Sequence, residues 1–142
     1  MVKIMEVTAL DRLREAGIRV TAPRLRIYEF LLNNYTHPTC DDIYRSLSSE
    51  DSSLSLASVY NVTEKLEQAG LVRLIVSPDG QKHYDAKTDF HGHFCCKECG
   101  RMIDVSCCKD LGLKDLKGAR IDSMNLLLSG VCKDCLICAS EP

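Results

Sequence analysis

The sequence predicts an α+β protein in two parts, a helical part that ends in a β-hairpin over residues 1–84 and a small α/β part over residues 85–142. Apolar residues recur at helical spacing through most of the first part, and the pattern then changes to one typical of strands. Pairs of cysteines separated by two residues occur only in the second part. A chain of 142 residues has room for one domain or two small ones.

Four helices are expected in the first part. The first covers residues 6–16. The second begins after Thr21, a plausible N-cap followed closely by a proline, and ends near Asn33. Thr39 caps the third, and the fourth spans residues 55–69. Each segment carries apolar residues three and four positions apart, so each is expected to bury one face.

A β-hairpin is expected directly after Gly70. Residues 71–76 and 81–84 form its strands, and residues 77–80 form the turn. Helices followed by such a hairpin form a winged helix-turn-helix, in which the fourth helix enters the DNA major groove. We therefore expect base contacts from this helix and phosphate contacts around it, with the candidate residues Ser55, Ser58, Tyr60, Asn61, Arg19, Arg24 and Lys65.

Charge supports this interpretation only locally. The net charge is −2, but residues 1–26 carry six basic side chains against three acidic ones. A basic patch on one face is the electrostatic mark of a nucleic-acid binder. A winged helix used for protein contacts remains the alternative.

The chain shows no membrane or secretion signal. Its longest apolar stretch, near residues 124–131, is far shorter than the roughly 20 residues of a membrane span. The first residues lack the continuous apolar run of a signal peptide. We therefore expect a cytoplasmic protein, in which nine cysteines indicate metal or redox chemistry rather than disulfides.

The second part is too small to be stable without a metal, disulfides or a partner subunit. Strands are expected at residues 91–96, 102–105 and 125–131, with a helix between residues 109 and 117. Two Cys-x-x-Cys pairs supply the four thiolates of a closed structural zinc site, namely Cys96, Cys99, Cys132 and Cys135. An iron–sulfur motif is disfavoured because no suitably spaced fourth cysteine follows Cys138. Five thiols have no assigned role, and a redox role stays open for them: Cys40, Cys95, Cys107, Cys108 and Cys138.

A second set of ligands contains no sulfur. His91 and His93 share one face of an expected strand and can hold one ion together. Asp85, Asp104 and His37 would complete a nitrogen and oxygen shell suited to Fe(II) or Mn(II), and able to hold Zn(II). The alternative is a set of surface histidines, since spacing alone does not show that His37 reaches the others.

The chain resembles the ferric uptake regulator family along almost its whole length, and most closely its peroxide-sensing branch. The resemblance is carried by GIRVTAPRLRIYEFL, HPTCDDIYRSL, SLASVYNVTEKLEQAGLV, HYDAKTDFHGHFCCKECG with RMIDV, and GVCKDC. It implies a homodimeric repressor of palindromic operators, with zinc on the four cysteines, a dimerisation role for the second part, and a regulatory metal on the histidines and aspartates. Aspartate at both Asp85 and Asp104 is typical of the peroxide sensors.

We therefore expect a metal-dependent, peroxide-responsive transcriptional repressor rather than an enzyme. An iron- or zinc-uptake repressor of the same family is the nearer alternative. A metal-dependent hydrolase is the more distant one, disfavoured because no spare general base stands beside the ligands. Two features depart from the family pattern, the sequence Thr21-Ala22-Pro23-Arg24 and the extra thiols. The thiols leave a cysteine-based redox response open.

Overall fold

The computed structural model describes residues 7–107, 110 and 112–140. The chain divides into two compact units, Met1–Thr88 and Asp89–Pro142. The last strand of the first unit extends to Asp85, and the Lys87 amide donates to the Asp85 carboxylate (2.8 Å). Lys3 and Cys108 lie outside the described residues.

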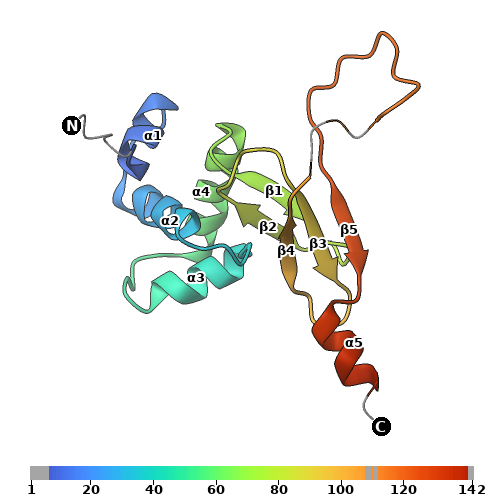
Figure 1. The fold of residues 1–142 in the computed structure, drawn as a ribbon. Helices are drawn as coiled ribbons and strands as arrows, with labels where there is room; N and C mark the ends of the chain where they lie inside the picture. The colour runs from blue at the N-terminus through green and yellow to red at the C-terminus, as the bar shows by residue number, and fades with distance from the viewer. Residues whose placement is uncertain (1–6, 108–109, 111, 141–142) are drawn as a thin grey trace, which may run out of the picture. The chain divides into compact units, whose positions relative to one another are not determined.

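The first unit contains four helices, α1 (Ala9–Glu15), α2 (Ala22–Leu32), α3 (Cys40–Ser48) and α4 (Leu56–Gln68) (Figure 1). Each begins after a hydroxyl side chain that accepts a hydrogen bond from the first turn. The predicted caps Thr21 and Thr39 are confirmed. Thr39 also forms a capping box with Asp42, which satisfies two otherwise unpaired backbone amides at the start of α3.

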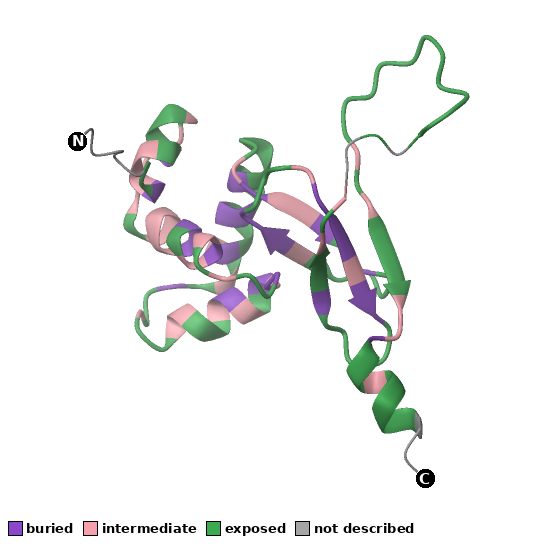
Figure 2. Cartoon of the chain, viewed as in Figure 1, coloured by how far each residue is buried: buried purple, intermediate pink, exposed green. Residues whose placement is uncertain are grey.

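The predicted hairpin is confirmed as β1 (Arg73–Val76) and β2 (Lys82–Asp85), which pair antiparallel with Arg73 opposite Asp85. The core of this unit comes from all four helices and the hairpin, and its fully buried members include Leu13, Ile27, Ile43 and Leu66. Figure 2 shows buried segments on these helices and on the hairpin. The α+β class expected from the sequence is therefore confirmed.

The second unit is a three-stranded sheet followed by a helix. Its strands β3 (Gly92–Cys96), β4 (Met102–Val105) and β5 (Leu127–Gly130) lie in the order β4-β3-β5 (Figure 1). β4 pairs antiparallel with β3, whereas β5 pairs parallel with it, so that Cys96 lies opposite Gly130. The parallel pairing carries the second cysteine pair to the end of β3.

One expectation for this unit is wrong, and one helix was not predicted. The described residues between 110 and 117 form no helix, because Gly112 and Asp115 adopt positive φ values of 61° and 64° that interrupt a right-handed helix. A helix that the sequence did not predict, α5 (Lys133–Ser140), follows β5. In the described part of the chain, no helix has the length and apolar character required to span a membrane.

Candidate metal and DNA-binding sites

Four thiols of the second unit converge on one point. The Sγ atoms of Cys96 and Cys135 are 3.9 Å apart, and those of Cys99 and Cys132 are 3.8 Å apart. All four sulfurs lie within 4.8 Å of one another. A zinc ion about 2.3 Å from four tetrahedral sulfurs holds those sulfurs about 3.8 Å apart. The thiol geometry therefore fits a closed zinc site.

The local backbone also favours the thiolate form of one of these cysteines, Cys96. The Cys132 amide donates to Cys96 Sγ (3.3 Å). Hydrogen bonds from the amides of Cys99 and Cys132 lower the pKa of Cys96 to about 6, because they stabilise the thiolate. Gly100 follows the first pair with φ 72° and donates its amide to the Cys96 carbonyl (3.0 Å), which closes the tight turn between Cys96 and Cys99.

The remaining described thiols lie outside this cluster. Cys95 is buried beside Cys96, and neighbouring strand residues point to opposite faces. Cys40 is buried in the first unit with its Sγ 3.4 Å from Thr63 Oγ1. Cys107 is half-buried and Cys138 is exposed on α5. None of these four belongs to a ligand cluster among the described residues.

One imidazole and one carboxylate lie close together in the first unit, and we call this pair the first half-site. His37 Nε2 lies 3.7 Å from Asp85 Oδ2, and both side chains are buried. This separation is too long for a hydrogen bond and suits two ligands of one ion. His37 lies between α2 and α3, whereas Asp85 ends β2, so the fold of this unit joins residues distant in the sequence.

The second unit contributes two imidazoles and one carboxylate, the second half-site. His91 Nε2 and His93 Nε2 lie 3.5 Å and 3.7 Å from the same oxygen, Asp104 Oδ1. The register of the sheet accounts for this, since His93 on β3 lies directly opposite Asp104 on β4. Both histidines are buried, and their ring centroids are 4.5 Å apart. The set offers only nitrogen and oxygen donors.

One histidine that the sequence analysis did not single out contacts the first half-site. His83 Nδ1 lies 2.8 Å from the His37 carbonyl oxygen. The sequence contained a signal for His83, because it stands two residues before Asp85 in an expected strand. The two side chains therefore lie on the same face of β2.

The candidate DNA-contacting residues fall into three groups. Arg24, Ser58 and Asn61 line one shallow hollow between the start of α2 and the exposed side of α4. Tyr60 lies apart from them, where the charge of Asp41 raises its pKa. Outside the hollow are the remaining candidates, Arg19, Ser55 and Lys65, all exposed.

Two of these candidates also have structural roles. Ser55 is the N-cap of α4, and its Oγ accepts from the Ser58 amide (3.1 Å). Arg24 donates from Nη1 to the Arg19 carbonyl (2.7 Å), which ties the start of α2 to the preceding loop.

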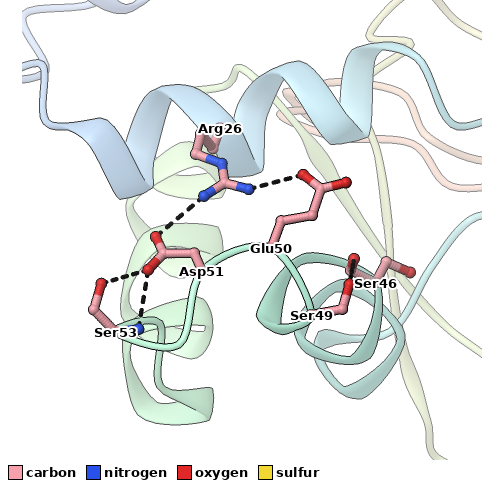
Figure 3. Close-up of polar contacts among 6 residues, drawn as sticks. All are labelled: Arg26, Ser46, Ser49, Glu50, Asp51 and Ser53. Carbon is pink, nitrogen blue, oxygen red and sulfur yellow. Dashed lines mark hydrogen bonds and ion pairs between the residues drawn. The ribbon is translucent and has the colours of Figure 1, made fainter.

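Arg26 anchors the turn between α3 and α4, a role that the sequence analysis missed. Its Nη2 lies 3.1 Å from Glu50 Oε2, and its Nη1 lies 3.1 Å from Asp51 Oδ2 (Figure 3). Asp51 accepts hydrogen bonds from Ser53, and these, with the Arg26 charge, lower its pKa. Arg26 is thus one cation of the N-terminal basic region that pairs within the protein.

Known proteins resemble the chain over most of its length. The model of the ferric uptake regulator family matches residues 15–126. The peroxide operon regulator of Bacillus subtilis is 34% identical over 134 residues, with 89% of this chain and 90% of that protein covered. The peroxide-responsive repressor PerR of Staphylococcus aureus is 32% identical over 131 residues, with 89% and 88% covered.

A solved structure supports the same assignment. The ferric uptake regulator from Pseudomonas aeruginosa with manganese matches with a TM-score of 0.73 and 27% identity, and the match covers 88% of this chain and 98% of that one. These relatives are regulators, so the hydrolase alternative is not favoured. The chain therefore belongs to the ferric uptake regulator family of metal-dependent, DNA-binding transcriptional repressors.

Proposed function

We propose that this protein is a peroxide-responsive repressor that binds palindromic operator DNA as a homodimer when its regulatory site holds Fe(II) or Mn(II). The observation that carries the proposal is the pairing of an aspartate with imidazoles in each half-site. The similarity of the chain to peroxide regulators over most of its length supports assignment to the peroxide-sensing branch of the family. We place the protein in the cytoplasm, where thiols stay reduced.

Zinc on Cys96, Cys99, Cys132 and Cys135 would have a structural role. Four protein thiolates saturate a tetrahedral ion and leave no position for a substrate. The second unit has a small core, with β5 and most of α5 exposed (Figure 2), so metal binding would supply much of its stability. The boundary we propose between a DNA-binding and a dimerisation domain lies near Asp85.

The regulatory ion would be held by His37 and Asp85 of the first half-site together with His91, His93 and Asp104 of the second. An ion that binds both half-sites links the DNA-binding unit to the dimerisation unit. If that linked arrangement binds DNA better, metal and DNA must strengthen each other's binding by the same factor. The donor set of imidazole and carboxylate suits Fe(II) and Mn(II) and does not select for zinc through thiolates.

Peroxide sensitivity would come from this donor set. These residues would hold Fe(II), which would supply the electrons that reduce hydrogen peroxide, whereas Mn(II) in the same place would do so poorly. The imidazoles of His37 and His91 are the side chains that we expect to gain an oxygen atom. An oxidised imidazole is a weaker ligand, so the two units lose their shared ion and the affinity for DNA falls.

The DNA would be recognised by α4. Asn61 can pair with adenine, and Tyr60 can pack on a thymine methyl. Ser55 and Ser58 stand near the start of the same helix, whereas Arg19, Arg24 and Lys65 would contact phosphates.

Gel-shift assays with an operator selected from random duplex DNA test the proposal. Protein loaded with Fe(II) or Mn(II) should bind the selected probe, and brief peroxide treatment should release only the Fe(II) form. Peptide mass spectrometry should then find added oxygen on the peptides that contain His37 or His91. Oxidation confined to cysteines, with DNA binding restored by dithiothreitol, would support a thiol switch and refute the proposal. Equal insensitivity of both metal forms would indicate an iron-uptake repressor.

A further inference from the structure

His37 has an unfavourable backbone conformation. Its φ is 55°, and Asp115 is the only other non-glycine residue in the described part of the chain with a positive φ. L-residues rarely adopt this left-handed region because Cβ approaches the carbonyl oxygen. His37 also precedes Pro38, which restricts it further. Such a conformation persists only where the surrounding structure holds it in place.

Two consecutive residues of strand β2, His83 and Tyr84, form hydrogen bonds that hold the His37–Pro38 backbone in place. The Tyr84 amide donates to the Pro38 carbonyl (3.0 Å). The His83 ring nitrogen Nδ1 lies 2.8 Å from the His37 carbonyl. Because a carbonyl oxygen only accepts, Nδ1 carries the proton and donates it. The two hydrogen bonds therefore hold the successive carbonyls of His37 and Pro38.

The same strand also carries the carboxylate that faces the His37 ring. His83 and Asp85 lie two residues apart, on one face of β2. Asp85 Oδ2 lies 3.7 Å from His37 Nε2, so β2 contacts both the backbone and the side chain of His37. His37 and Asp85 are buried, whereas His83 is half-buried. All these contacts lie within the first unit.

We infer that His83 is a positioning residue for the regulatory site. Its hydrogen bond to the His37 carbonyl keeps the His37 backbone in the left-handed conformation that directs the imidazole at Asp85. The inference rests on the proposed role of His37 and Asp85 as metal ligands. Loss of the hydrogen bond leaves both ligands in place but lets the His37–Pro38 segment relax, so metal binding must then restore its order.

Mn(II) binding to the full-length, zinc-loaded protein tests the inference, with free Mn(II) followed by electron paramagnetic resonance. His83→Phe keeps a ring of similar size but has no donor, whereas His83→Asn places an amide nitrogen close to the Nδ1 position. Loss of a partner that orients a metal ligand typically weakens affinity by about 10- to 100-fold. We expect a loss of about that size for His83→Phe and an affinity close to the original for His83→Asn.

A second measurement uses the metal-free first half-site. The Tyr84 amide should exchange its proton faster in His83→Phe than in His83→Asn, because the segment that accepts its hydrogen bond has become mobile. Lys82→Ala, an exposed change on the same strand, is the control and should change neither Mn(II) affinity nor Tyr84 exchange. If His83→Phe does not fold, His83→Ala replaces it.

The outcomes separate this inference from the proposed function. Unchanged Mn(II) affinity in His83→Phe would overturn the inference, and so would equal losses in the Phe and Asn variants, which indicate a purely structural role. His37→Ala tests the ligand role itself. Mn(II) affinity unaffected by His37→Ala would refute the proposed regulatory site, whatever the His83 variants show.

Discussion

The two buried tyrosines of the first unit should respond in opposite directions to loss of the hydroxyl group. The Tyr28 side chain is fully buried, and its hydroxyl has no hydrogen-bond partner among the described residues. Tyr84 is also buried, but its hydroxyl interacts with the side chains of Thr63 and Cys40. Burial raises the pKa of Tyr84 to about 12, so the hydroxyl stays protonated at ordinary pH.

The magnitudes follow from the hydrogen bonds. A buried polar group without a partner costs about 1–3 kcal/mol, so Tyr28→Phe removes a penalty of that order. The lost hydroxyl also leaves a small void, which reduces the gain, and we expect the free energy of unfolding to rise by about 1 kcal/mol. Tyr84→Phe removes a net stabilisation of about 0.5–1.5 kcal/mol.

Urea unfolding of the zinc-loaded protein, followed by far-ultraviolet circular dichroism, measures both changes. In a thermal unfolding experiment on the same variants, each 1 kcal/mol would shift the melting temperature of a unit of this size by about 4–8 °C. The ring is kept in both variants, so the packing loss is nearly matched and the sign difference reports the hydroxyl environment. A clear loss of stability in Tyr28→Phe would show that the Tyr28 hydroxyl has a partner and would refute the reasoning.

Three further predictions concern the zinc site, DNA recognition and pH. Cys96→Ser should lose zinc and unfold the second unit, because metal binding contributes about 10–16 kcal/mol in zinc-finger peptides; zinc content and circular dichroism measure this, and a folded variant with unchanged zinc would contradict it. Asn61→Ala should weaken binding to the selected operator more than binding to random DNA in fluorescence anisotropy, whereas equal losses would indicate a phosphate contact. The capping hydrogen bonds from Thr39 lower the pKa of Asp42. A lowered pKa stabilises the fold above the ordinary value of 3.8, and this stabilisation disappears as the pH falls through the folded pKa. Asp42→Asn should therefore make the melting temperature fall less steeply as the pH is lowered from neutral to about 3. An unchanged dependence of the melting temperature on pH would show that the cap contributes nothing.

The sequence by itself determined the features that depend on neighbouring residues. Thr21 and Thr39 cap their helices through bonds to amides three residues away, and the hairpin follows a short polar turn, so local spacing was sufficient. The spacing of the Cys-x-x-Cys pairs is also enough to predict that each pair forms a tight turn with two metal ligands.

Only the tertiary structure decided how distant segments meet. Parallel pairing of β5 with β3 brings Cys132 to Cys96, and no local pattern specifies that register. The ion pairs of Arg26 with the α3–α4 turn and the hydrogen bond of His83 to the His37 carbonyl likewise join residues more than twenty positions apart. A charged or aromatic side chain has the same local spacing whether it faces DNA, solvent or another segment. Which partner it meets depends on long-range packing, because the burial of the whole core, and not the local sequence, sets the relative position of helices and strands.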